Sequence, residues 1–246
     1  MTKKTTILNV PVDATTPGEA LSTLLGFLDE KRSHLLVTPN PEMIMLANKD
    51  PEFMRVMKSA DLVVPDGIGA VMASRLNEVK IKGRVTGYDL MLALFGKIAQ
   101  DGQERKVYLF GAKPGVAEAA REKLIKEYPG LSVVGTHDGY FTAEQENSMI
   151  KEIIDKQPDI LVIGMSMGMS EKWADAHRGL PVRLMACVGG AIDGWAGNVP
   201  RAPLFFRRLG LEWFYRLIRQ PSRRWRRQLV LPVFAWKVIW GKVTGR

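Results

Sequence analysis

The sequence has few of the residues that build disulfides or metal centres. Its one cysteine, Cys187, lies in the apolar run Val182 to Val188, so no internal disulfide can form. That setting predicts a small buried core residue, and the chain fits a reducing compartment. The three histidines, His34, His137 and His177, are scattered, and no Asp-x-Asp motif occurs. Neither a Cys/His metal site nor a metal held against a diphosphate by paired aspartates is therefore predicted.

Long apolar runs are also missing. The segment Met1 to Thr6 is polar and no long apolar stretch follows it, so no secretory signal is expected. The longest candidate near the C-terminus, Leu229 to Trp236, is interrupted by Pro232 and stops at Lys237. A membrane-spanning helix needs about 20 predominantly apolar residues, so none is predicted. The Gly-Lys-Ser/Thr phosphate loop of many nucleotide-binding proteins is absent too.

Acidic residues are scarce in one part of the chain, residues 201–246, which we call the tail. The tail contains twelve Lys and Arg residues but a single acid, Glu212. The chain as a whole carries +9, so the tail accounts for +11 and residues 1–200 for −2. A near-neutral body with a strongly basic tail points to an anionic surface as partner, either lipid or nucleic acid.

The tail also holds four of the six tryptophans. Arginines alternate with an apolar stripe up to Ile218, and after Pro221 they flank Trp225 ahead of a second stripe that ends near Trp240. This composition is typical of a helix lying in a membrane interface. We therefore predict that residues 221–246 dock on an anionic membrane; a helical hairpin packed on the body is the alternative. Nucleic acid is not expected, because the aromatic residues share one face instead of forming a spaced stacking platform.

Residues 1–200 alternate between short apolar runs and amphipathic helical patterns. With 46% hydrophobic and 25% charged residues, the chain has ample material for a core. Such alternation predicts an α/β domain over residues 1–200, with a Rossmann-like, mainly parallel sheet covered by helices on both faces. The tail is predicted to be a helical appendage. The predicted strands are Thr5 to Val10, His34 to Thr38, Ala60 to Val64, Lys106 to Phe110, Leu131 to Gly135, Asp159 to Met165 and Val182 to Val188.

Asp66 follows one of these runs and precedes Gly67 and Gly69, after which a helix is expected. Ligands of open α/β sheets bind at the carboxyl ends of the strands. A carboxylate beside a helix start that favours anions suggests a base next to a nucleotide. The alternative is that Asp66 only caps the helix, as aspartate commonly does.

Other polar residues follow predicted strands and could converge on one crevice. They are Thr38, Asn40, Tyr140, the segment Ser166 to Ser170, and Asp193. Arg75, Lys82 and Arg84 supply positive charge near Asp66. The turn that begins at Gly111 resembles a nucleotide-binding βα unit without the full dinucleotide fingerprint, and a packing turn explains it equally well. This set suits displacement of a phosphate leaving group with an aspartate as general base.

Several motifs, taken in order along nearly the whole chain, resemble the TagA/WecG/CpsF glycosyltransferase family. They are Thr38-Pro39-Asn40-Pro41-Glu42, Val64-Pro65-Asp66-Gly67, Arg84-Val85-Thr86-Gly87-Tyr88-Asp89-Leu90, Gly135-Thr136-His137-Asp138-Gly139-Tyr140-Phe141, Gly189-Gly190, Gly197-Asn198-Val199-Pro200-Arg201-Ala202-Pro203 and Leu209-Gly210-Leu211-Glu212-Trp213. The resemblance implies inverting, metal-independent transfer of N-acetylmannosamine or a related hexose from a UDP-sugar to polyprenyl-diphosphate-linked GlcNAc. The best-known branch of the family builds the linkage unit of wall teichoic acid.

The resemblance also implies roles for individual residues. Asp66 would deprotonate the acceptor hydroxyl, Thr38 and Asn40 would position substrate, and Arg84 would face the diphosphate. The residues expected to bind substrate are Tyr140, Asp193, Gly111 and Ser170, together with Arg216, Arg223 and Arg226 of the tail, which would reach the lipid diphosphate.

One motif departs from the family pattern. The family usually has Gly-x-Pro-x-Gln-Glu where this chain has Ser166-Met167-Gly168-Met169-Ser170-Glu171. Ser170 replaces a glutamine expected in the site and reaches less far, although it can still donate one hydrogen bond. The departure bears on the donor sugar more than on the class of reaction.

The expected partners are a UDP-sugar donor, a polyprenyl-diphosphate-linked acceptor and an anionic membrane surface, with no cofactor and no nucleic acid; a homo-oligomer is a further possibility. The expected location is cytoplasmic and peripheral, at the inner face of the cell membrane. Two rival functions stay open from the residues alone. The motif Phe110-Gly111-Ala112 would suit a dinucleotide-dependent oxidoreductase, and the basic tail would suit a non-catalytic membrane adaptor.

Overall fold

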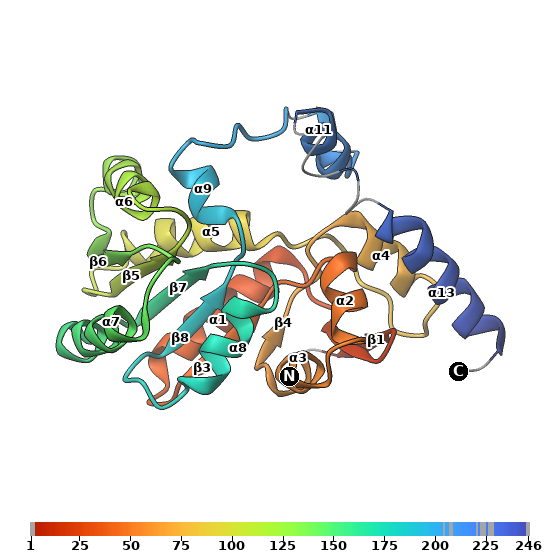
Figure 1. Ribbon diagram of the computed structural model, residues 1–246, viewed down its shortest axis with the longest axis horizontal. Coiled ribbons are helices and arrows are strands. Elements are labelled where there is room, and N and C mark those ends of the chain that lie inside the picture. The colour runs from red at the N-terminus through yellow and green to blue at the C-terminus, as the bar shows by residue number, and fades with distance from the viewer. Residues whose placement is uncertain are drawn as a thin grey trace.

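The computed structural model describes residues 3–203, 205–206, 209–219, 221, 225 and 229–244 (Figure 1). Its elements, in chain order, are β1 (Lys4–Ile7), β2 (Val10–Asp13), α1 (Pro17–Asp29), β3 (His34–Val37), α2 (Pro41–Ala47), α3 (Pro51–Ser59), β4 (Leu62–Val63), α4 (Ile68–Ser74), α5 (Gly87–Ile98), β5 (Lys106–Gly111), α6 (Val116–Glu127), β6 (Ser132–His137), α7 (Ala143–Lys156), β7 (Ile160–Gly164), α8 (Met169–Ala176), β8 (Leu184–Cys187), α9 (Ala191–Trp195), α11 (Glu212–Arg219) and α13 (Val230–Thr244).

The predicted α/β fold with a mainly parallel sheet is confirmed. Six strands form one sheet in the order β4-β3-β8-β7-β5-β6, and every neighbouring pair is parallel. Because all six strands point the same way, the segments that follow them meet along one edge, which we call the carboxyl edge.

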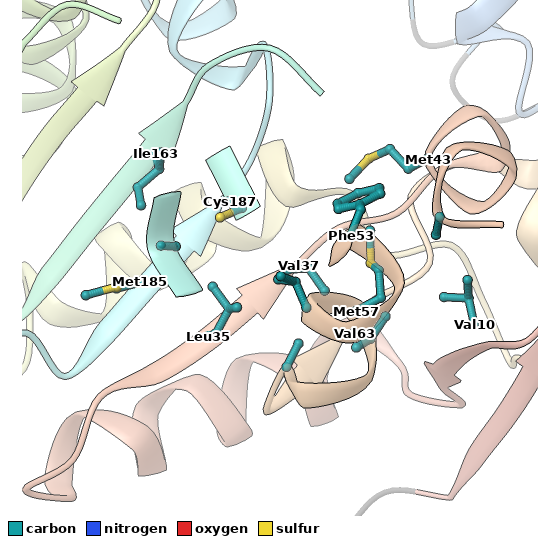
Figure 2. Packing of buried hydrophobic residues seen from close by; sticks show 14 of the residues in the cluster. Val10, Leu35, Val37, Met43, Phe53, Met57, Val63, Ile163, Met185 and Cys187 are labelled. Atoms are coloured by element: carbon teal, nitrogen blue, oxygen red, sulfur yellow. The ribbon is translucent and has the colours of Figure 1, made fainter. Parts of the chain in front are cut away.

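Helices cover both faces of this sheet, as the alternation of side chains along the strands requires. On β3, Leu35 and Val37 belong to one buried cluster and Leu36 to the other. The first cluster includes residues of α2, α3, α4, α7 and α8, and Figure 2 shows part of it around Phe53 and Cys187. The second includes residues of α1, α5, α6 and α9. Cys187 is buried, as predicted.

Three helices begin at a capping side chain followed by proline. Thr16, Asn40 and Asp50 each accept a hydrogen bond from a backbone N–H in the first turn of α1, α2 and α3. Proline suits the first helical position because its fixed φ fits the helix and its missing N–H is not needed there. The sequence therefore defines these helix starts locally. Of the three helices, α2 follows strand β3, and α3 follows α2.

The predicted strand Thr5 to Val10 is wrong in one respect. The region is a hairpin in which β1 pairs antiparallel with β2, outside the six-stranded sheet. Leu8 and Asn9 form its two-residue turn with positive φ, 44° and 66°. Such turns match the twist of the two strands, and Asn tolerates this conformation whereas Leu rarely adopts it. The unfavourable Leu8 is why the sequence alone did not signal a turn here.

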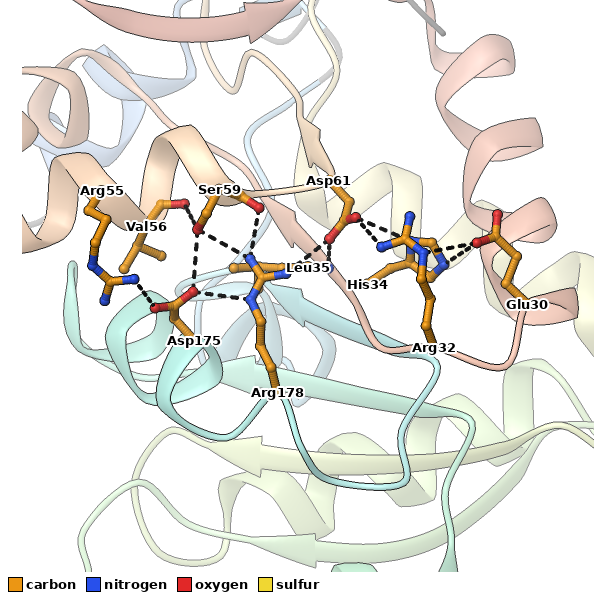
Figure 3. Close-up of polar contacts among 10 residues, drawn as sticks. All are labelled: Glu30, Arg32, His34, Leu35, Arg55, Val56, Ser59, Asp61, Asp175 and Arg178. Carbon is orange, nitrogen blue, oxygen red and sulfur yellow. Dashed lines mark hydrogen bonds and ion pairs between the residues drawn. The ribbon is translucent and has the colours of Figure 1, made fainter.

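The edge opposite the carboxyl edge carries a network of charged side chains, which we call the amino-edge network (Figure 3). Asp61 accepts hydrogen bonds from the N–H of Leu35 at 2.9 Å, from Arg32 at 2.7 Å and from Arg178 at 3.2 Å. His34 is fully buried, with Nε2 3.0 Å from Glu30. Its other members are Arg55, Ser59 and Asp175.

The tail packs on the body with its helix α13. Phe234 is 4% exposed within the first cluster, and α13 contacts α2 and α4. Figure 1 shows α13 beside α4, at the end of the molecule away from α6 and α7. In the part of the chain that the structure describes, no helix is long and apolar enough to cross a membrane.

Candidate active site

The centre of the carboxyl edge lies at the neighbouring strands β3 and β8. The helices that follow them, α2 and α9, pack on opposite faces of the sheet, so the chain diverges here, which is the arrangement at which open α/β sheets bind their ligands. Thr38 directly follows β3 and is 6% exposed. Its hydroxyl donates a hydrogen bond to the carbonyl of Cys187 at 3.1 Å, which ties it to the end of β8. Thr38 is therefore held rigidly at the point where the chain diverges.

Asp66 lies beside Thr38 and Asn40, because backbone bonds join the loops that follow β3 and β4. The N–H of Asp66 donates to the carbonyl of Pro39 at 3.0 Å, and the N–H of Val85 donates to the carbonyl of Pro65 at 3.2 Å. Of the two interpretations of Asp66, the helix cap is not observed: Gly67 occupies the cap position of α4 and no side chain caps it. Asp66 is partly exposed, and its side chain does not cap α4.

Asn40 has a structural task. Its Oδ1 accepts a hydrogen bond from the N–H of Met43 at 3.0 Å and so starts α2. This bond orients the whole side chain and directs its amide nitrogen away from the helix start. Donation from that nitrogen to substrate stays a prediction.

Arg84 reaches the site from the segment before α5, and its side chain is 16% exposed. It forms an ion pair with Glu212, the single acid of the tail, whose side chain is 18% exposed. This contact between residues far apart in sequence was not anticipated, since nothing local in the sequence predicts it. The two other basic side chains expected near Asp66 have local roles: Lys82 pairs with Glu19 at 3.4 Å, and Arg75 ends α4.

Gly111 ends β5 against β7, and the structure gives it a packing role. A Cβ built on Gly111 would lie 2.4 Å from the carbonyl oxygen of Gly164, and its φ of +134° disfavours any other residue. Ala112 then bonds the carbonyl of Gly164 and accepts from the N–H of Gly139, joining three strand ends. The packing-turn interpretation is therefore supported, and contact between Gly111 and a donor nucleotide stays a prediction.

The departure at Ser170 involves two side chains that are almost completely buried. Ser170 is 1% exposed, and its hydroxyl accepts a hydrogen bond from the N–H of Met165 at 2.9 Å. Glu171 is 2% exposed and accepts from the N–H of Gly168 at 3.0 Å. Burial raises the pKa of Glu171 to about 7. Both side chains fold the turn between β7 and α8, while the role of Ser170 in binding the donor stays a prediction.

The same turn contains a pattern that sequence reasoning overlooked. Gly164-Met165-Ser166-Met167-Gly168 has the Gly-x-Ser-x-Gly spacing of the nucleophile elbow in serine hydrolases. Ser166 itself is exposed and does not have positive φ. The buried His34 belongs to the opposite edge. Nδ1 of His137 and Nδ1 of His177 each lie 2.8 Å from a backbone carbonyl, that of Asp138 and that of Trp173. The spacing therefore comes without the Ser–His hydrogen bond that a hydrolase needs.

Asp193 and Tyr140 lie farther along the carboxyl edge. Asp193 is partly buried on α9, and its carbonyl accepts from the N–H of Asn198 at 3.0 Å. Tyr140 follows the edge strand β6 and is 66% exposed. Between β4, which leads to Asp66, and β6 there are five strand spacings of about 4.8 Å, or roughly 24 Å. Tyr140 and Asp66 could therefore contact only opposite ends of an extended ligand.

Three arginines of the tail were predicted to reach the lipid diphosphate. Arg223 and Arg226 lie outside the described residues, and only the backbone of Arg216 belongs to a described helix. Within the described residues, no group of three or more His, Cys, Asp or Glu side chains could hold a metal ion.

Comparison with known proteins gives this geometry its context. Residues 5–246 match the family described as Glycosyl transferase WecG/TagA/CpsF family. The N-acetylglucosaminyldiphosphoundecaprenol N-acetyl-beta-D-mannosaminyltransferase of Bacillus subtilis is 36% identical over 214 residues, covering 87% of this chain and 82% of the relative. The Staphylococcus aureus protein of the same name is 32% identical over 244 residues, covering 98% and 94%. The chain therefore belongs to the WecG/TagA/CpsF family of glycosyl transferases.

Proposed function

We propose that this protein transfers N-acetylmannosamine from a UDP-sugar to a GlcNAc residue linked to a polyprenyl diphosphate. The relatives carry this acceptor and this sugar in their names. The observation that carries the proposal is the backbone bond from Asp66 to Pro39, which holds a carboxylate beside Thr38 at the carboxyl edge. A general base must lie within hydrogen-bond reach of the proton that it removes, and a fixed backbone position favours this.

In the proposed reaction, Asp66 removes the proton from the acceptor hydroxyl as its oxygen attacks the anomeric carbon. The bond from that carbon to the donor phosphate oxygen breaks, and UDP leaves with the electron pair. Attack from the side opposite UDP inverts the anomeric centre. Arg84 balances the charge on the leaving diphosphate, a task that suits a guanidinium because it binds phosphate oxygens in pairs.

The donor would extend from β4 towards β5 and β6. The turn at Gly111 and the residues Asp193 and Tyr140 would then lie on the nucleoside side, and Asp66 on the sugar side. Four strand spacings separate β4 from β5, or roughly 19 Å, which defines the length that an extended ligand would cover.

The proposed acceptor requires access to a membrane surface, and the tail offers a means. On α13, Val233, Trp236, Ile239, Trp240 and Val243 are exposed, and the rings of Trp236 and Trp240 stack at 5.8 Å. An apolar strip of this kind is typical of a helix that lies in the headgroup region, and basic residues next to it add attraction to anionic lipid. We therefore keep the proposals of a membrane-docking appendage, of a boundary near residue 200, and of a location at the inner face of the membrane.

The test is release of UDP from a panel of UDP-sugars, UDP-N-acetylmannosamine included, with a lipid-linked GlcNAc acceptor and with or without chelator. Acceptor-dependent release that survives chelation is expected. Acceptor-dependent release of UDP only from another donor would contradict N-acetylmannosamine as the transferred sugar. Loss of activity on chelation would contradict the proposal that no metal is needed. The oxidoreductase alternative loses its support, because Gly111 has a packing role and the chain belongs to a family of glycosyl transferases. Membership of an enzyme family also speaks against a non-catalytic adaptor.

A further inference from the structure

Two ion pairs, which we call tethers, link the tail to one short segment of the body, residues 84–89, in addition to the packing of α13 on α2 and α4. Arg84 pairs with Glu212, and Asp89 pairs with Arg201. The guanidinium of Arg201 also lies 4.9 Å above the ring of Tyr88. These two ion pairs have opposite polarity, since the body supplies the cation in the first and the anion in the second. A variant that removes the acid of one pair, Glu212 or Asp89, can therefore be compared with a variant that removes the acid of the other.

Close packing fixes the position of Glu212. Gly210 lies against Ile68, the first residue of α4, so closely that an added Cβ would be 2.9 Å from the Cβ of Ile68. Ile68 is two residues from Asp66, so the turn that leads into Glu212 rests on the loop that carries the proposed base. Glu212 thus lies at the carboxyl edge because the tail backbone leaves it no other place.

The charge of Glu212 is unusual for its position. It is the only acid among the twelve basic residues of the tail, and it sits in a site that we propose for a diphosphate. Its carboxylate and the guanidinium of Arg84 are both largely shielded from water, at 18% and 16% exposure. A partly buried guanidinium without an anion is costly, so a carboxylate in this place stabilises the empty site. Among the residues that the structure describes, the buried Nε of Arg84 has no hydrogen-bond partner, so the guanidinium still has a donor to offer.

We propose that Glu212 is a placeholder for the diphosphate of the substrate. It occupies Arg84 while the site is empty, and an incoming diphosphate displaces it, because two phosphate groups carry more charge and more acceptor oxygens than one carboxylate. This inference rests on the proposed function, which assigns Arg84 to the diphosphate. Displacement of Glu212 breaks one tether of the tail, while the ion pair between Arg201 and Asp89 stays intact. The diphosphate then replaces Glu212 as the partner of Arg84, so substrate binding breaks the contact of the tail at Glu212.

The test is calorimetric titration of the full-length protein with pyrophosphate at constant ionic strength. Removing the placeholder in E212Q is expected to tighten pyrophosphate binding about fivefold, the factor that corresponds to an ion pair of about 1 kcal/mol. E212D keeps the charge but shortens its reach, and we expect it to fall between wild type and E212Q. In R84Q/E212Q the gain should disappear, because the guanidinium that receives the anion is gone.

D89N is the matched control, since it removes the same charge and breaks the other tether. Its pyrophosphate affinity should stay within about twofold of wild type. Unchanged or weaker binding by E212Q, an equal gain in D89N, or no pyrophosphate binding by any variant would overturn the proposal. Thermal melting of each variant verifies that the fold is intact.

A transferase assay on the wild-type protein separates this inference from the proposed function. Sugar transfer by the wild type, with no gain in pyrophosphate affinity in E212Q, would support the proposed function and contradict the placeholder role of Glu212. A gain in E212Q that depends on Arg84, without sugar transfer from any donor, would keep the anion exchange and remove the proposed reaction.

Discussion

Strand β4 is two residues long, with Asp61 just before it and Asp66 shortly after it. Asp61, at the amino edge, bonds Arg32, Arg178 and the N–H of Leu35 through its carboxylate. Asp66, at the carboxyl edge, is fixed through its own backbone N–H, which bonds Pro39. The bonds of Asp61 that connect it to other segments therefore use its carboxylate, whereas the bond between Asp66 and Pro39 uses the backbone.

The two edges of the sheet differ in the kind of bond that holds them. At the amino edge, charged side chains bond one another and bury His34 among them. At the carboxyl edge, backbone bonds join the loops, and single side chains such as Thr38 and Ser170 bond backbone groups there.

The largest expected effect is on catalysis at the carboxyl edge. Replacing Asp66 with Asn should lower kcat about 10³-fold, since general base catalysis contributes factors of this size, and should leave UDP affinity and Tm nearly unchanged. The assay is acceptor-dependent UDP release, with calorimetry for UDP binding. D193N is the comparison variant and should raise KM for the donor with little change in kcat. Turnover by D66N at the wild-type rate would exclude Asp66 as the base.

The counterpart at the amino edge is Asp61→Asn. It should lower the free energy of unfolding by about 3 kcal/mol, because it removes the charge from a carboxylate that is only 13% exposed and weakens the bond to the N–H of Leu35, while kcat stays unchanged. Burial opposes ionisation of Asp61, but the N–H of Leu35 and Arg32 lower its pKa overall. Its contribution is therefore complete above the unfolded pKa of about 3.8 and is lost as the pH falls through the lower folded value.

Denaturant unfolding as a function of pH measures this effect. Asp29→Asn is the control, because Asp29 pairs with Arg105 at 2.7 Å but is 72% exposed, so the loss should stay below about 1 kcal/mol. Equal losses in both variants would mean that burial of the network does not contribute to stability.

A smaller effect is expected at Glu171, which lies near the carboxyl edge but has a structural role. Its pKa of about 7 exceeds the ordinary value of 4.5 for a glutamate, so the folded state binds the proton more tightly. Stability from this group is therefore complete below about pH 4.5, falls as the pH rises to about 7, and is constant above. E171Q should remove this dependence and be more stable than wild type at pH 8 by about 2 kcal/mol. A difference between the two proteins that does not vary with pH would contradict the prediction.

The smallest effect concerns the tail, which packs on α2 and α4 beyond the carboxyl ends of β3 and β4. Replacing Trp236 and Trp240 with Ser should weaken binding to vesicles that contain phosphatidylglycerol about tenfold, because both rings are exposed. Phe234→Ala is the contrast, since Phe234 packs on the body and its loss should lower stability more than vesicle affinity. Co-sedimentation with vesicles measures the binding. Vesicle binding by the double variant as strong as that of the wild type would contradict the proposal that α13 docks on the membrane.

Local signals in the sequence predicted much of the fold. The strands of the main sheet and the helices between them follow from the apolar runs, and the starts at Asn40 and Asp50 follow from capping residues next to proline. The hairpin turn at Leu8 and Asn9 was missed, because Leu gives no turn signal there. The positions of Thr38 and Asp66 at strand ends were readable for the same reason, since a strand end is a local feature.

The sequence by itself determined the alternation of strands and helices, the polar residues at the strand ends and the basic, Trp-rich tail. Only the tertiary structure decided which strands are neighbours, and with them which loops meet. The pairing of Arg84 with Glu212, the backbone bond between Asp66 and Pro39 and the burial of Ser170 all join segments through space or depend on packing. The physical reason is that hydrophobic periodicity and capping act within a few residues, whereas contacts between loops depend on strand order, which no local pattern encodes.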